Sequence, residues 1–329
     1  MSSNLRTTLD RLKPLNRENS STPHRNPRTL ESSANEGDSL ARLATCFQTY
    51  LNTFVNLRRL QIRALAKVLS WMGHYPTGRS CLISLRSRRW TRNVFDQVLG
   101  YRRTFVSFAA AQKCASRYDN DGHEHPDEIA FHVNSSQSLR ESDYPVLFFL
   151  SEHCSQFSRV FDLGGNVGNL LYAYQDYLRF SGDLIWMIFD LPEQKRLGTK
   201  LAIERNERRI RYVHSTAEAN GVDLFIASGS LHYFDLSLPE ILGRLDDLPQ
   251  HVIVNRTPYS SREAILTVQD GVSSVVPCKL HSRSQLEEGM NKLGYLQRGQ
   301  WPIHERTLRV PLYPEYSYGH YLGFYFERI

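Results

Sequence analysis

The sequence has no apolar run long enough to span a bilayer, and its first residues lack the apolar core of a secretory signal. It is also poor in cysteine pairs: the five cysteines lie far apart, and none forms a C-x-x-C pair. This pattern excludes a disulfide framework and a structural zinc site. We therefore expect a cytoplasmic protein with buried free thiols and no transmembrane segment.

Two nucleotide-binding motifs are missing as well. The sequence contains no G-K-[ST], which a P-loop requires, and no stretch has the G-x-G-x-x-G spacing of the dinucleotide fingerprint. A nucleoside site in this chain must therefore be built from a different turn.

Positive charge is concentrated in the first third of the chain. Residues 1–115 contain 19 Lys and Arg against 6 Asp and Glu, whereas the remainder is acidic. A basic segment can contact nucleic acid, an anionic membrane surface or an acidic substrate, or it can be a solvated face. The segment shows no interleaved aromatics and no recognition module, which disfavours nucleic acid as a partner.

Composition divides the chain into three regions. Residues 1–38 are polar and too poor in apolar side chains to fold, which predicts a disordered tail. Residues 39–143 predict a helical cap region, because apolar side chains recur at helical intervals from Leu40 and a helix ends near Gly73. These helices could cover the following domain or form a homodimer. From residue 144 onward the chain forms the third region.

The third region alternates apolar strands with helices, a pattern typical of a parallel α/β sheet covered on both faces. A final pair of segments has no crossover helix between its members and predicts an antiparallel pair. Helices are expected to begin near Asn166, Glu193, Ala217 and Leu238. The expected parallel strands are 159–164, 184–190, 210–215, 223–229 and 251–257.

The first strand runs into the sequence FDLGGNVGN, a glycine-rich turn before a helix. Glycines allow a ligand to approach the backbone closely and tolerate positive φ. The pattern is D-x-G-x-x-x-G, with Asn166 where a middle glycine often lies. The candidate ligand-binding residues of this turn are Asp162, Gly164, Gly165, Asn166 and Gly168.

The second strand ends in Asp190, followed by Leu191, Pro192 and Glu193. Carboxyl ends of neighbouring parallel strands meet at one edge of the sheet, so Asp190 is expected beside the glycine turn. A carboxylate there can accept both ribose hydroxyls of a nucleoside. The same residue suits the N-cap of the next helix, and both roles can hold together.

Later strands bring further polar residues to the same edge. Ser215 is a candidate contact to an adenine edge, and the small residues Ser228 and Gly229 leave room for a ligand. His232 is either a general base or a structurally bonded histidine. Arg256 is either a substrate clamp or the partner of an aspartate.

One polar segment raises the question of a metal. Asp119, Asp121, His123 and His125 alternate within DNDGHEHPDE. A surface loop explains this segment better than a metal site. An arginine patch at Arg86, Arg88, Arg89 and Arg92 adds to the basic N-terminal region.

Several motifs in this order resemble a family of class I S-adenosylmethionine (SAM)-dependent methyltransferases, whose members are often associated with surface-polysaccharide and other biosynthetic gene clusters. The resemblance covers about residues 144–326 and is carried by YPVLFFL, FDLGGNVG, FDLPE, ASGSLHYF, VNRTP, LTVQDG and YLGFYF. It implies a Rossmann-like sheet of seven strands with the last antiparallel, SAM as methyl donor, and residues 144–329 as the SAM-binding domain.

The resemblance implies that Asp162, Gly164, Gly165 and Gly168 form the SAM turn and that Asp190 contacts the ribose. It lends no support to His232 or Arg256 as catalysts. The expected function is methylation, on oxygen, of a small-molecule or saccharide acceptor. Two alternatives stay open: a non-catalytic SAM-fold scaffold or regulatory protein, and a nucleotide-sugar or dinucleotide enzyme.

Overall fold

The computed structural model describes residues 61–62, 64–99, 102–117, 133, 138–270 and 275–329. The chain divides into two compact units, Met1–Gln61 and Ile62–Ile329, and the helices and strands given below belong to the second unit. The expected tail, the helix from Leu40 and the DNDGHEHPDE segment lie outside the described residues. Among the described helices, none is long and apolar enough to cross a bilayer.

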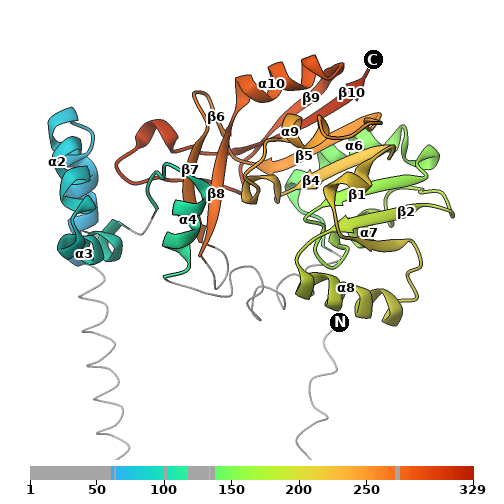
Figure 1. The fold of residues 1–329 in the computed structure, drawn as a ribbon, viewed down its shortest axis with the longest axis horizontal. Helices are drawn as coiled ribbons and strands as arrows, with labels where there is room; N and C mark the ends of the chain where they lie inside the picture. The colour runs from blue at the N-terminus through green and yellow to red at the C-terminus, as the bar shows by residue number, and fades with distance from the viewer. Residues whose placement is uncertain (1–60, 63, 100–101, 118–132, 134–137, 271–274) are drawn as a thin grey trace, which may run out of the picture. The chain divides into compact units, whose positions relative to one another are not determined.

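The chain alternates helices and strands through most of the unit (Figure 1). The strands are β1 (Arg159–Leu163), β2 (Ile185–Phe189), β3 (Ile210–Val213), β4 (Leu224–Ser228), β5 (His251–Thr257), β6 (Tyr259–Ser260), β7 (Ile265–Asp270), β8 (Val275–Ser282), β9 (Tyr295–Ile303) and β10 (Tyr321–Arg328). The α-helices are α2 (Pro76–Ser87), α3 (Arg89–Leu99), α4 (Phe108–Ala115), α6 (Tyr144–Ser151), α7 (Asn169–Tyr174), α8 (Pro192–Glu204), α9 (Leu238–Leu242) and α10 (Arg283–Lys292). Short 3-10 turns are η3 (Glu141–Asp143), η4 (Cys154–Gln156), η5 (Thr216–Ala219), η6 (Leu231–Tyr233) and η7 (Pro314–Tyr316).

Seven strands form the main sheet, in the order β3-β2-β1-β4-β5-β10-β9. The first five are parallel, and β10 runs antiparallel to both β5 and β9. This is the Rossmann-like sheet with one antiparallel strand that the resemblance to class I methyltransferases implies. The expected fold class is confirmed, and so are the five parallel strands to within two residues at each end.

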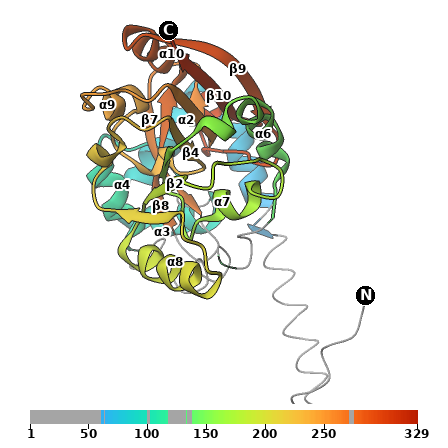
Figure 2. The ribbon, with the colours of Figure 1, turned by 90° about the vertical axis from the view of Figure 1, so that its right-hand side faces the viewer.

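Helices cover both faces of this sheet because its strands are apolar on both sides. Along β4, Leu224 and Ile226 face one hydrophobic cluster and Phe225 and Ala227 face the other. The first cluster includes side chains of α6 and α7, and the second includes those of α9 and α10. Figure 2 shows α6 and α9 on opposite sides of the strands.

Two expected helices differ from the structure. The helix expected near Asn166 begins at Asn169, because Asn166 (φ 60°) and Gly168 (φ 96°) take left-handed conformations that keep the turn open. The segment expected as a helix near Ala217 is only the short 3-10 turn η5. The helix ending near Gly73 and the helix starting near Leu238 are confirmed.

A second, three-stranded sheet follows β5 and was not predicted. Its order is β6-β8-β7, with β8 antiparallel to β7. Figure 1 shows β7 and β8 side by side with α4 next to them. Ala111 and Ala115 of α4 pack on Val268 and Val275 of this sheet. The small sheet thus has an apolar contact with α4.

Two expectations about side chains need correction. Cys114, Cys154 and Cys278 are buried free thiols as expected, but Cys81 is exposed. Arg86 does not belong to a solvated basic patch: it is buried, and its Nη2 lies 3.2 Å from Oδ1 of Asp96. A buried guanidinium needs such a partner to offset its desolvation.

Gly323 allows Trp301 to lie flat across β10. A Cβ at Gly323 would lie 2.1 Å from the Trp301 ring, whose Nε1 donates to Asn255 Oδ1 at 3.1 Å. We expect Gly323→Ala to destabilise the protein by about 1–3 kcal/mol through overpacking, measured as a lower melting temperature. Gly319→Ala is the matched control, since a Cβ there meets nothing within 4 Å. Equal melting temperatures for the two variants would contradict this packing.

Candidate active site

The carboxyl ends of β1, β2, β4 and β5 border a cavity of about 1320 Å³. All the predicted site residues line this cavity except Gly168 and Ser215. Gly168 is instead the N-cap residue of α7, and the Ser215 hydroxyl accepts a hydrogen bond from the backbone of Ala217 at the start of η5. The adenine contact expected of Ser215 stays a prediction.

The glycine turn bends sharply over the end of β1. Gly164 has φ 69°, and a Cβ on it would lie 2.4 Å from Cβ of Ser230. A Cβ on Gly165 would lie 2.4 Å from Oδ2 of Asp162. Neither position therefore has room for a side chain, which is the reason for the paired glycines.

Asp190 joins the end of β2 to this turn. Its Oδ2 accepts a hydrogen bond from the backbone N–H of Asn166 at 2.7 Å, and its Oδ1 accepts from the N–H of Leu191 at 2.7 Å. The Tyr212 hydroxyl on β3 donates to the carbonyl of Asn166 at 3.1 Å. The turn, Asp190 and β3 thus form one connected edge, and the two aspartates lie on neighbouring strands as expected.

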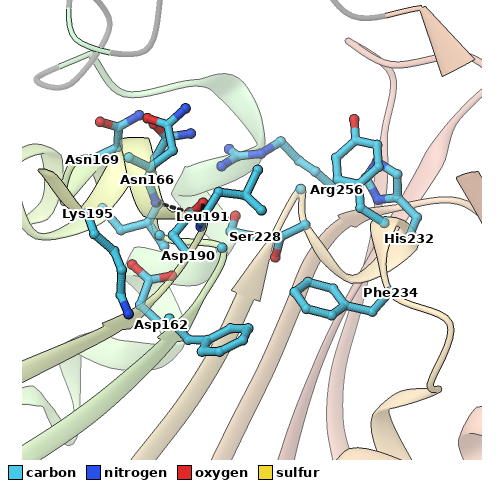
Figure 3. A pocket seen from close by; sticks show the side chains of 18 of the residues that line it. Asp162, Asn166, Asn169, Asp190, Leu191, Lys195, Ser228, His232, Phe234 and Arg256 are labelled. Carbon is cyan, nitrogen blue, oxygen red and sulfur yellow. Dashed lines mark hydrogen bonds between the residues drawn. The ribbon is translucent and has the colours of Figure 1, made fainter. Parts of the chain in front are cut away.

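Two amide side chains leave buried oxygens at this edge. Oδ1 of Asn166 and Oδ1 of Asn169 accept no hydrogen bond from any described residue, and both residues line the cavity. Figure 3 shows them on the same side of the pocket as Asp190 and Leu191. A buried acceptor without a donor is costly, so a ligand with hydrogen-bond donors fits here.

Asp162 lies under the turn and is almost fully buried. The pKa of its carboxyl is raised to about 7, mainly by burial and also by the nearby charge of Asp190. The Trp186 indole N–H, which donates to Oδ2 at 3.0 Å, and the Arg256 guanidinium both act to lower this pKa. The Asp190 carboxylate favours a cationic ligand in the cavity, and such a ligand would in turn favour ionisation of Asp162.

Arg256 is the partner of an aspartate, one of the two roles considered for it. Its Nη1 lies 2.7 Å from Oδ1 of Asp143, and both side chains are buried. The Tyr174 hydroxyl donates to the same Oδ1 at 2.9 Å. Arg256 Nε has no hydrogen-bond partner among the described residues. The ion pair fastens the start of α6 to the end of β5.

His232 lies on the other side of the pocket from the glycine turn, together with Phe234 and Arg256 (Figure 3). The imidazole is buried, and its ring centroid lies 4.1 Å from that of Tyr233 and 6.0 Å from that of Tyr321. His232 is therefore held by aromatic rings at the cavity wall.

Several cavity residues were not predicted. Lys195 on α8 lines the end near Asp190, and its Nζ lies 3.0 Å from Nδ1 of His214. Gln269, from the small sheet, accepts a hydrogen bond from the Tyr321 hydroxyl at 3.4 Å. Arg140 enters from the turn before α6. Only Lys195 follows a sequence signal, because it lies in the first turn after Asp190.

No protein-family model matches this chain, and no curated protein matches it. Solved structures do align with it. A 1,6-didemethyltoxoflavin N1-methyltransferase of Burkholderia thailandensis is 19% identical, with a TM-score of 0.39 over 65% of this chain and 86% of that one. An O-methyltransferase of neocarzinostatin biosynthesis is 18% identical, with a TM-score of 0.43 over 67% of this chain and 65% of that one.

A geranyl diphosphate C-methyltransferase of Streptomyces coelicolor is 15% identical, with a TM-score of 0.41 over 63% of this chain and 85% of that one. All three of these structures contain S-adenosylhomocysteine. The assignment of the fold rests on the strand order and directions described above.

The raised pKa of Asp162 predicts a pH-dependent stability. Between pH 3.8 and about 7 the unfolded carboxyl is ionised while the folded one keeps its proton. The free energy of unfolding therefore falls as pH rises through this window, by at most roughly 1.4 kcal/mol per pH unit. We expect Asp162→Asn to remove this fall, so the variant gains melting temperature relative to the wild type between pH 5 and pH 8.

The control is Asp176→Asn, which changes an exposed carboxylate and should follow the wild type. Parallel melting curves for Asp162→Asn and the wild type across that range would contradict the buried, protonated carboxyl.

Proposed function

We propose that this chain is a methyltransferase that binds SAM in the cavity at the glycine turn and methylates a small acceptor. The observation that carries the proposal is the Asp190 carboxylate, which is hydrogen-bonded to the turn and lines the cavity. These backbone bonds fix the direction of a group suited to ribose hydroxyls. The connected edge from β1 to β3 supplies the remaining surface for a nucleoside.

The residues present fit the other parts of SAM. The buried oxygens of Asn166 and Asn169 need donors, and an ammonium group supplies them. Asp162 and Asp190 favour a positively charged ligand. Leu191 adds an apolar side chain to the cavity, and Ser228 and Gly229 line it with little bulk. We assign the cofactor to this end of the cavity.

When bound, SAM supplies a methyl group on a sulfonium, and a nucleophile takes the methyl while the C–S electron pair stays on sulfur. The chain must then hold the acceptor in line, which is the main contribution to such a transfer. We propose oxygen as the acceptor atom, since His232 at the cavity wall is suited to accept the proton of a hydroxyl. Arg256 acts as a positioning residue, because its ion pair with Asp143 holds the start of α6 against the end of β5.

Asp190→Asn tests the cofactor site. We expect it to weaken binding of SAM and of S-adenosylhomocysteine by roughly 10- to 100-fold, because hydrogen bonds to a charged group contribute about 1.5–3 kcal/mol. Isothermal titration calorimetry measures this directly. Asp183→Asn is the matched control: it removes an exposed carboxylate near the opposite end of β2 and should leave both affinities unchanged.

If the wild type binds neither nucleoside, the proposed function is wrong. If it binds NAD tightly instead, the nucleotide-sugar or dinucleotide alternative is favoured. If it binds SAM but releases no S-adenosylhomocysteine in the presence of small-molecule extracts, the non-catalytic alternative is favoured.

A further inference from the structure

The cavity has a second end, formed by residues outside the glycine turn and Asp190. Its wall is formed by Tyr321 of β10, Gln269 of β7, Arg306, and Arg140, the N-cap residue of η3. The cavity, of about 1320 Å³, exceeds the usual size of a single small-molecule site. The second end is therefore available to the acceptor.

Most cations that line the cavity are already paired. Arg256 is bound by Asp143, Arg196 by Glu193, and Lys195 contacts His214. Arg140 and Arg306 differ: within the described part of the chain, neither guanidinium donates a hydrogen bond or forms an ion pair. The hydrogen bonds of Arg140 to described residues use its backbone: its N–H donates to Oδ2 of Asp143 at 2.9 Å, and its carbonyl accepts from the N–H of Asp143 at 2.9 Å.

Arg140 is half-buried, and it lines the cavity. Burial lowers the pKa of its guanidinium, and the nearby charges of Arg256 and Arg306 lower it further. Asp143 and Glu305 act in the opposite direction. Three guanidinium groups thus face two carboxylates, and Asp143 is already engaged by Arg256 and Tyr174.

We propose that Arg140 and Arg306 form an oxyanion subsite that binds a carboxylate or phosphate group of the acceptor. The proposal rests on the proposed function, because it takes the end of the cavity left over by the cofactor. An oxyanion would neutralise the excess positive charge and accept hydrogen bonds from the N–H groups of both guanidinium groups. The planar fork of arginine matches both carboxylate and phosphate.

We assign the subsite to the acceptor because of the residues around Arg306. The charge of Arg306 acts on Tyr321, which also interacts with Gln269 of the small sheet. These residues lie on β10 and β7, outside the connected edge of β1, β2 and β3 that holds the glycine turn and Asp190. An acidic acceptor bound there would still lie in the same cavity as the methyl donor.

The test uses the full chain saturated with S-adenosylhomocysteine, titrated with inorganic phosphate, acetate and acetamide. We expect phosphate or acetate to bind and neutral acetamide not to bind. The stronger of the two anions identifies the acceptor group as phosphate or carboxylate. Arg140→Gln should weaken anion binding roughly tenfold or more, whereas Arg309→Gln, at an exposed arginine outside the cavity, should not.

Two outcomes would overturn the subsite. One is equal binding of acetate and acetamide, or no loss of anion binding in Arg140→Gln. The other comes from comparing S-adenosylhomocysteine with 5′-methylthioadenosine, which lacks the amino-acid portion. If Arg140→Gln weakens only the former, the guanidinium binds the carboxylate of the cofactor. Failure of the wild type to bind S-adenosylhomocysteine at all contradicts the proposed function instead, and melting temperatures verify that the variants are folded.

Discussion

The hydrogen bond from the backbone of Asn166 to the carboxylate of Asp190 is the contact on which the site depends. It joins two neighbouring strands at the point where both leave the sheet, so the turn after β1 cannot move independently of the end of β2. The left-handed conformation of Asn166 directs this N–H toward β2. Asparagine tolerates that conformation better than most residues, which explains its place in a turn otherwise made of glycine.

The ion pair between Asp143 and Arg256 is the second constraint. It lies in a buried position and is joined by the hydroxyl of Tyr174 on α7. Three segments far apart in the sequence therefore meet at one carboxylate. Breaking such a pair leaves an uncompensated buried charge, so its members hold one another in place. Arg256 therefore lines the cavity with its Nη1 engaged by Asp143.

The main sheet and half of the site were predictable from the sequence because their signals are local. Apolar strands of four to seven residues, each ending in or followed by a polar or small residue, define both the parallel sheet and its functional edge. Asp162, Asp190 and the glycines follow from the same pattern. The alternation of apolar segments with helices also predicts which side chains meet, since parallel strands share one carboxyl edge.

The residues at the second end of the cavity were not predictable from the sequence, because they meet only through contacts between distant parts of the chain. Arg140 lies before α6, Gln269 on a strand of the small sheet, and Tyr321 on β10. No spacing in the sequence connects these positions. The partner of Arg256 was equally hidden, because Asp143 lies 113 residues away along the chain. Ser215 shows the converse: it follows a strand as expected, yet its hydroxyl serves the local turn.

The place of the small sheet in the chain has a consequence for how such a protein can diversify. β6, β7 and β8 are inserted between β5 and α10, after all five parallel strands have been laid down. The insertion packs on α4 and, through Cys278 and Leu280, on the core of the main sheet, and it contributes Gln269 to the cavity. The glycine turn and Asp190 come from earlier segments. Substitutions in this one continuous stretch would change the cavity wall at Gln269 and leave the sequence of the glycine turn and of Asp190 as it is. The two parts of the cavity wall can therefore evolve at different rates.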